Sequence, residues 1–225
     1  MRKLIFLIGN SGTGKDTVAK YMNYTHNWHK VASYTTRPRR EGEHQCDEHI
    51  FMRWGAAANS PDFWAAQHDL HIFAKTYYGG HHYWVTQEQL LQVPSVRMPE
   101  ANASMAEKRK PDEDRPLLWR ESPAIYPTLY IIDERGLIDI LLDVERSKWM
   151  CNTFDWDVWF LLRHERDIRE CVEASRIERD KDRVDDRNKL MQILTRIGKM
   201  PRMITNYGSR EEMYSVLDNL NKSHF

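Results

Sequence analysis

A glycine-rich segment close to the amino terminus has the residue types and the spacing of a phosphate-binding loop. Five apolar residues, Leu4-Ile5-Phe6-Leu7-Ile8, precede the segment Gly9-Asn10-Ser11-Gly12-Thr13-Gly14-Lys15-Asp16-Thr17, which matches the pattern G-x-x-x-x-G-K in full. In a turn between a strand and a helix, several backbone N–H groups point at one spot, and the helix dipole adds positive charge. Glycine permits the close approach that a phosphate needs. We therefore predict that residues 9–17 bind the phosphates of ATP, with Lys15 as a catalytic cation.

Asp16 occupies the position at which the usual motif has Ser or Thr, and Thr17 follows it. Carboxylate and hydroxyl oxygens are ligands of the kind that Mg²⁺ prefers. We predict that Asp16 and Thr17 handle a magnesium ion that accompanies ATP. The alternative is that Asp16 only complements the positive end of the helix dipole.

A second cluster of residues is suited to a second phosphate. Arg37 and Arg40 lie three residues apart, and their forked guanidinium groups can grip a phosphate through paired hydrogen bonds. The hydroxyl of Tyr78 could add a neutral hydrogen bond. We predict a clamp for an acceptor phosphate; the alternative is a basic turn next to core aromatic residues.

Arginines also recur late in the chain. Phosphoryl transfer needs in-line positioning and neutralisation of the transferred group, and it needs no general base. Arg176 and Arg187 are the predicted catalytic arginines. The alternatives are that Arg179 or Arg183 serves instead, or that all four form the solvated face of a helix.

These motifs together resemble guanylate kinases. The resemblance rests on segments in the family's order: Ser33-Tyr34-Thr35-Thr36-Arg37-Pro38-Arg39-Arg40-Glu41-Gly42-Glu43, then Tyr77-Tyr78-Gly79, then Asp133-Glu134-Arg135-Gly136, and two arginines eleven residues apart. It implies a single guanylate kinase-like domain over residues 1–225: a P-loop NTPase-type parallel sheet with helices on both faces. The implied parts are a core (1–33 and 128–225), an acceptor lobe (about 34–85) and a lid (about 176–187), with an insertion at about 94–127.

The resemblance also implies which residues would bind the acceptor and the adenine of ATP. The positions that read guanine in the family hold Ser33, Asp69, Gly80 and Asp133, of which Ser33 and Asp133 keep the family's residue type. Glu43 is kept beside the arginines, and His49 stands where a phosphate-gripping Tyr is expected. Asn206, before the last helix, is expected beside adenine, or in a plain turn.

The expected acceptor is therefore GMP or dGMP. The segment Asp47-Glu48-His49-Ile50-Phe51 also resembles ribose 1,5-bisphosphate phosphokinase, which makes a sugar phosphate the alternative acceptor. A kinase that acts on a polynucleotide or a modified base, and a non-catalytic guanylate-kinase-like binding module, are two further hypotheses. The monophosphate clamp argues against the first, and the intact phosphate loop argues against the second.

Short apolar runs predict strands that alternate with helices, which is typical of a parallel α/β sheet. The expected strands lie at 4–8, 31–34, 129–132 and 158–162. The expected helices run from the glycine loop to about 23, over about 165–197 with a break near 180, and over 210–220. The proline-rich stretch 94–127 predicts a long insertion.

Composition sets outer limits on function. The chain has 225 residues, of which 41% are hydrophobic and 29% charged, and its formal net charge is zero. It therefore shows no global bias toward nucleic acid or anionic membranes. Cys46, Cys151 and Cys171 are too widely spaced for a disulfide framework or a CxxC metal site. We expect a cytoplasmic monomer or homodimer whose partner is a small-molecule nucleotide, with no membrane and no nucleic acid.

Overall fold

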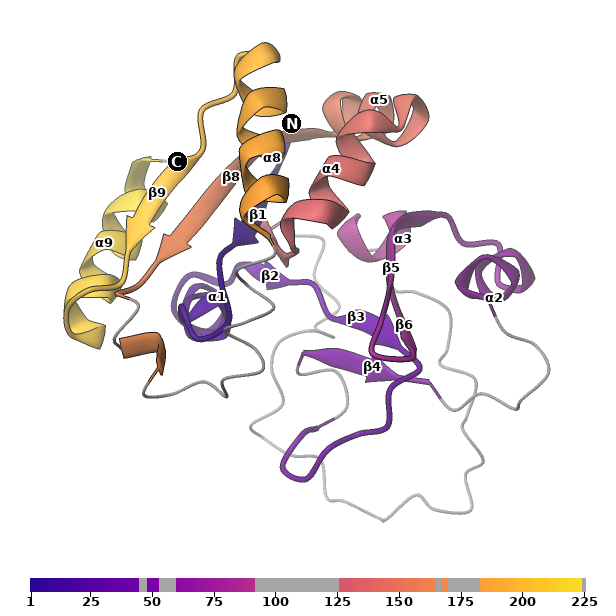
Figure 1. Cartoon of the computed structure of the whole chain (residues 1–225), viewed down its shortest axis with the longest axis horizontal. Coiled ribbons are helices and arrows are strands. Elements are labelled where there is room, and N and C mark those ends of the chain that lie inside the picture. Colours follow the sequence, from indigo (N-terminus) through magenta and orange to yellow (C-terminus); the bar gives the residue numbers. More distant parts are fainter. Residues whose placement is uncertain (45–47, 53–59, 92–125, 165–166, 170–182, 224–225) are drawn as a thin grey trace. The chain divides into compact units, whose positions relative to one another are not determined.

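The computed structural model describes residues 1–44, 48–52, 60–91, 126–164, 167–169 and 183–223. By their internal contacts the residues form two compact units (Figure 1). Met1–Lys30 and Tyr126–Phe225 make the first, which we call the parallel-sheet unit. Val31–Ile125 makes the second, which we call the mixed-sheet unit.

The parallel-sheet unit is built on five strands. Their order across the sheet is β2 (His29–Lys30), β7 (Thr128–Ile131), β1 (Arg2–Ile8), β8 (Phe154–Leu162) and β9 (Arg202–Thr205). All four neighbouring pairs are parallel. The central strand β1 is apolar and buried from Leu4 to Ile8, as a strand covered on both faces must be.

Helices cover both faces of this sheet. On one side lie α1 (Lys15–His26) and α9 (Arg210–Ser223); on the other lie α4 (Glu134–Leu142), α5 (Val144–Thr153) and α8 (Val184–Arg196) (Figure 1). Ile5 and Leu7 pack with Val18 of α1 and Leu217 of α9 in one buried cluster. Because side chains alternate along a strand, Phe6 points to the opposite face. There its ring lies 6.0 Å from that of Trp156.

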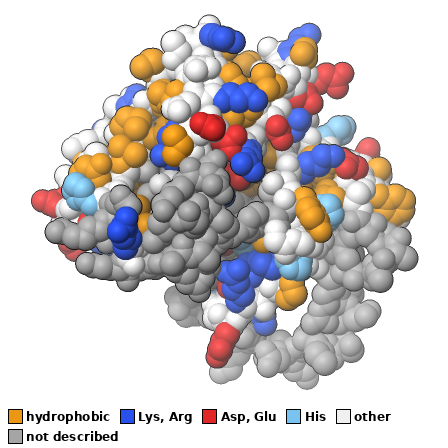
Figure 2. Space-filling view, viewed as in Figure 1, with side chains coloured by type: hydrophobic (Ala, Val, Ile, Leu, Met, Phe, Trp, Pro, Cys, Tyr) orange, Lys and Arg blue, Asp and Glu red, His pale blue; other side chains and the backbone are white. Residues whose placement is uncertain are grey.

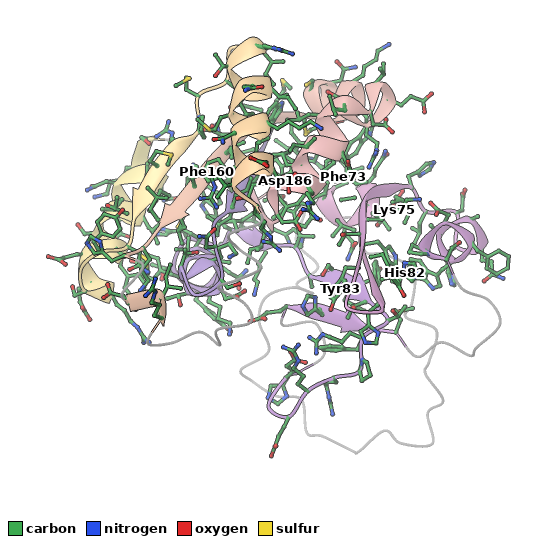
Figure 3. The ribbon with its side chains drawn as sticks, viewed as in Figure 1. Phe73, Lys75, His82, Tyr83, Phe160 and Asp186 are labelled. Carbon is green, nitrogen blue, oxygen red and sulfur yellow. The ribbon has the colours of Figure 1, made fainter. Side chains whose placement is uncertain are left out.

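The mixed-sheet unit has four strands in the order β4 (His49–Phe51), β3 (Ser33–Thr35), β6 (His81–Thr86) and β5 (Ile72–Tyr78), with the short helices α2 (Pro61–Gln67) and α3 (Gln87–Leu90). Strands β5 and β6 form a hairpin on which Figure 3 labels Lys75, His82 and Tyr83. Gly79 and Gly80 turn the hairpin with φ of 58° and 81°, which a two-residue turn of this hand requires.

The expected strand at 31–34 is wrong in its placement. It was assigned to the parallel sheet, but Ser33–Thr35 pairs with β4 and β6 in the mixed sheet. The reason is aromatic packing, because Tyr34 lies opposite Trp84 and both are buried. His29–Lys30 instead forms the short edge strand β2 of the parallel sheet.

The other expected elements compare as follows. Strands β1, β7 and β8 and helices α1 and α9 form within a few residues of the predicted bounds, and α8 covers the end of the helix predicted over 165–197. Residues 170–182 and most of 94–127 lie outside the described residues. Strands β2, β4, β5 and β6 and helices α2 to α5 were not predicted. None of the helices in the described ranges is long and apolar enough to cross a membrane.

Candidate active site

The predicted phosphate loop connects β1 to α1 at the carboxyl edge of the parallel sheet. Gly14 is the residue before α1 and has a φ of 97°, in the region that favours glycine. The Lys15 ammonium folds back over the loop and donates hydrogen bonds to the carbonyls of Gly9 and Asn10, at 2.7 and 2.8 Å. The hydroxyl of Thr13 donates to the same Asn10 carbonyl. These bonds close the loop around the lysine.

Residues at the ends of two neighbouring strands hold the loop from behind. Arg163, which follows β8, donates from Nη1 to the carbonyl of Gly12 at 3.0 Å. The Asn206 side-chain amide, which follows β9, donates to the carbonyl of Thr13 at 2.9 Å. A Cβ at Gly9 would lie 2.7 Å from the carbonyl oxygen of Leu161, so this position has no room for a side chain. The strand ends therefore set the shape of the loop.

Asp16 lies in the first turn of α1, next to a buried cation. Its Oδ1 is 3.7 Å from Nζ of Lys30, and 52% of its side chain is exposed. Carboxylate and hydroxyl oxygens at Asp16 and Thr17 fit the chemistry of Mg²⁺, which kinases hold through one or two protein ligands together with phosphate oxygens. In the described ranges, no three His, Cys, Asp or Glu side chains are grouped as a metal site.

Arg187 of α8 reaches the phosphate loop. Its Nη2 donates to Oδ1 of Asn10 at 2.5 Å. Nε and Nη2 also donate to one oxygen of Glu134, at 3.1 and 2.9 Å. Glu134 is 1% exposed, at the start of α4. One of the two predicted catalytic arginines is thus in contact with the predicted donor loop.

Asp133 precedes Glu134 and caps α4. Its Oδ1 accepts a hydrogen bond from the backbone N–H of Gly136 at 2.8 Å. Its other oxygen lies 4.0 Å from Nη2 of Arg183. Because β7 neighbours β1 in the sheet, Asp133 leaves its strand beside the phosphate loop.

In the mixed-sheet unit, Arg37 and Glu43 form a bidentate ion pair. Nη1 of Arg37 donates to Oε2 of Glu43 at 2.9 Å, and Nη2 donates to Oε1 at 2.8 Å. Glu43 also accepts from the backbone N–H of Arg40 at 2.8 Å. These bonds lower the pKa of Glu43 from 4.5 to about 2 and raise the pKa of Arg37. Arg37 is 8% exposed, whereas the Arg40 side chain faces solvent.

Three more residues of the mixed-sheet unit were predicted to bind the acceptor: Ser33 and His49 on neighbouring strands, and Asp69 in a turn. Ser33 and His49 lie opposite each other in β3 and β4, and the Ser33 hydroxyl is 2.8 Å from Nδ1 of His49. Asp69 follows α2 in an exposed turn with a φ of 52°, which Asp tolerates better than most residues.

Comparison with known proteins bears on the fold. No protein-family model and no curated protein sequence matches this chain. Among solved structures, the crystal structure of guanylate kinase from Anaplasma phagocytophilum is similar, with a TM-score of 0.52 and 15% sequence identity. The match covers 99% of this chain and 86% of that chain. The chain has the fold of a guanylate kinase. The predicted fold class, a P-loop-type parallel sheet with helices on both faces, is confirmed.

The structure brings the donor-side candidates together within the parallel-sheet unit. The glycine loop, Arg187 and Asn206 are connected by hydrogen bonds. Asn206 was predicted beside adenine or in a plain turn, and in this structure its side-chain amide contacts the loop backbone. Next to it, the ring of Tyr207 stacks on His164 with centroids 4.0 Å apart. Arg176 and the side chain of Tyr78 lie outside the described residues.

Sequence reasoning missed one contact and the roles of two residues of this site. Asn10 was predicted to bind phosphate, but its contact with Arg187 was not foreseen. Glu134 was noted only as part of the family-like segment 133–136 and was given no role, and Arg163 was not considered. The signal for Glu134 was a charged residue at the end of an apolar strand beside Asp133, where burial is expected and a charge needs a partner.

Proposed function

We propose that this chain is a nucleoside monophosphate kinase that transfers the terminal phosphate of ATP to a (deoxy)nucleoside monophosphate, with GMP or dGMP favoured. The observation that carries the proposal is the contact of Arg187 with the loop that contains Lys15. Two cations beside one glycine loop, in a chain with the fold of a guanylate kinase, are what a phosphoryl transferase requires.

In the proposed reaction, an oxygen of the acceptor phosphate attacks the γ-phosphorus of ATP, and the bond to the bridging oxygen breaks, which releases ADP. Backbone N–H groups of the loop hold the phosphates, while Lys15 and Arg187, with Arg176 from the lid, neutralise the transferred group. Asp16 and Thr17 are the residues that would hold Mg²⁺. When bound, the metal supplies further charge neutralisation on the phosphate oxygens.

On the acceptor side, the ion pair between Arg37 and Glu43 gives Arg37 and Arg40 different roles. Glu43 occupies both terminal nitrogens of Arg37, so we assign Arg37 chiefly to shaping the turn. The exposed Arg40 is the residue that we assign to the acceptor phosphate, together with Tyr78. Ser33, Asp69 and Asp133 are proposed to read the base, and His49, at the position of the phosphate-gripping Tyr, to contact the acceptor phosphate. The same proposal includes an acceptor-binding lobe at about 34–85 and a lid at about 176–187.

A coupled assay of ADP release tests this function. Wild-type protein with ATP and Mg²⁺ is offered GMP, dGMP, the other nucleoside monophosphates and ribose 1,5-bisphosphate, with Lys15→Ala as the inactive control. We expect turnover with GMP or dGMP above all others. Turnover with ribose 1,5-bisphosphate alone would assign a sugar-phosphate kinase instead. ATP binding without turnover on any acceptor would overturn the proposal.

A further inference from the structure

A buried carboxylate in the parallel-sheet unit has no place in the reaction described above. Glu134 is 1% exposed, and one of its oxygens accepts two hydrogen bonds from Arg187. Burying a carboxylate is costly unless a cation and hydrogen bonds compensate it. The pairing therefore fixes both groups: Glu134 needs the guanidinium, and the guanidinium is drawn to the start of α4.

Residues of two other elements lie beside the same guanidinium. Nη2 of Arg187 donates to Oδ1 of Asn10 in the phosphate loop, and its central carbon lies 5.9 Å from the centre of the Phe160 ring in β8. Figure 3 labels Phe160 in that strand and Asp186, the neighbour of Arg187, in the first turn of α8. Among the described residues, Nη1 of Arg187 has no hydrogen-bond partner, which leaves this nitrogen for a phosphate oxygen.

The turn of α8 that carries Arg187 is held at the same corner by adjacent charges. Arg135 donates from Nε to Oδ2 of Asp186, and Arg183 lies 4.0 Å from Asp133. Three consecutive residues, Asp133, Glu134 and Arg135, are thus each paired with an oppositely charged residue at the start of α8. Acidic and basic side chains are interspersed over this unit in Figure 2. The helix is therefore anchored without Glu134, and Glu134 acts on the guanidinium itself.

We propose that Glu134 is a positioning residue: it holds the Arg187 guanidinium beside the phosphate loop, with Nη1 directed to the terminal phosphate, before ATP binds. The inference rests on the proposed function. An arginine side chain has many rotamers, and fixing it in advance removes that entropic cost from the step in which charge must be stabilised. Asn10 completes the arrangement because it joins the guanidinium to the loop.

The test uses Glu134→Gln, which keeps the shape and one acceptor oxygen but removes the charge. Asp185→Asn is the matched control, since it removes an exposed carboxylate from the same first turn of α8 and leaves the pairs of Arg187 and Asp186 in place. Calorimetry measures the affinity for ATP and for ADP. Because only ATP has the terminal phosphate, we expect Glu134→Gln to weaken ATP binding about tenfold and ADP binding less than about twofold. Asp185→Asn should leave both affinities unchanged.

Steady-state kinetics provide a second test of the positioning role. In Glu134→Gln, kcat should fall at least about tenfold, with the acceptor KM within about twofold of wild type. In an Arg187→Ala background, the same change should cost nothing further, because its effect passes through Arg187. Equal losses of ATP and ADP affinity, or additive losses of kcat in the double variant, would overturn the positioning role.

The two proposals fail in different ways. If wild-type protein transfers phosphate but Glu134→Gln keeps the wild-type ratio of ATP to ADP affinity, the positioning role is wrong and the kinase function stands. If wild-type protein transfers no phosphate but Glu134→Gln still loses ATP affinity selectively, the kinase function is wrong and Glu134 positions Arg187 for binding alone.

Discussion

Arg37 and Glu43 face each other through two hydrogen bonds of 2.9 and 2.8 Å, in the geometry in which a guanidinium meets a carboxylate most strongly. The pair is formed six residues apart in sequence and also binds the backbone N–H of Arg40. It therefore gives the turn that follows β3 a fixed shape and makes that shape depend on the charge of Glu43.

The first prediction concerns stability and pH. Arg37 lowers the pKa of Glu43 from 4.5 to about 2, so the folded state binds the proton less readily than the unfolded state. The pair therefore contributes stability that is fully present above pH 4.5 and is lost as the pH falls toward 2. Urea unfolding at pH values between 7 and 3 should show Glu43→Gln less stable than wild type at pH 7, and the difference should shrink below pH 4.5. Parallel pH curves for the two proteins would contradict this.

The second prediction separates the two clamp arginines. Arg40→Ala should raise the KM of the acceptor about tenfold or more, because a charged phosphate contact is lost, and should leave kcat and stability nearly unchanged. The control is Arg39→Ala, which removes an exposed neighbouring charge and should have little effect. Initial rates with varied acceptor at saturating ATP measure both constants. An unchanged acceptor KM in Arg40→Ala would remove Arg40 from the acceptor site.

A contact could be predicted from the sequence when its residues lie close together along the chain, but not when they are far apart. The apolar strand 4–8 and the glycine loop are contiguous, so their structure and order follow from neighbouring residues alone. The contact of Arg37 with Glu43 is also local, although the sequence suggested that both arginines grip phosphate. Arg187 and Glu134 are 53 positions apart, and only the packing of α4 against α8 brings them together. No pattern in either segment encodes that packing.

The misplaced strand at 31–34 has a similar origin. A run of three or four apolar residues predicts a strand but does not predict its partners. Tyr34 joins the mixed sheet because Trp84 and Trp64, distant in sequence, pack against its ring at 5.4 and 4.7 Å. For Asn206, the sequence indicated a residue near the nucleotide, but the hydrogen bond to Thr13 depends on β9 lying next to β8.

The third prediction concerns the shape of the phosphate loop. Gly14 has a φ of 97°, and a Cβ there would lie 2.8 Å from the Asn206 amide nitrogen. Gly14→Ala should therefore weaken ATP binding about tenfold or more and lower stability by about 1–2 kcal/mol. Gly198→Ala is the control, since Gly198 also has positive φ but has open space around it. Gly198→Ala should lose stability and keep its ATP affinity, as measured by calorimetry and thermal unfolding.

The fourth prediction concerns Lys15. Lys15→Ala should lower kcat about 100-fold or more, because a cation on the transferred phosphate is lost, while the protein stays folded. Lys20→Ala, an exposed position of the same helix, is the control and should keep its activity. Turnover and thermal unfolding are measured for both. Turnover near wild type in Lys15→Ala would show that the loop does not serve phosphoryl transfer.

The last prediction decides between the two roles of Asp16. If Asp16 handles magnesium, Asp16→Asn should raise the Mg²⁺ concentration for half-maximal turnover about tenfold, because a neutral amide is a weaker ligand for a hard cation. If Asp16 only complements the helix dipole, the same change should cost about 0.5 kcal/mol of stability and leave the Mg²⁺ dependence unaltered. Lys30 lies 3.7 Å from the carboxylate and offsets part of its charge. Lys30→Met should therefore lower the Mg²⁺ requirement under the first role, since a carboxylate relieved of its cation attracts the metal more strongly.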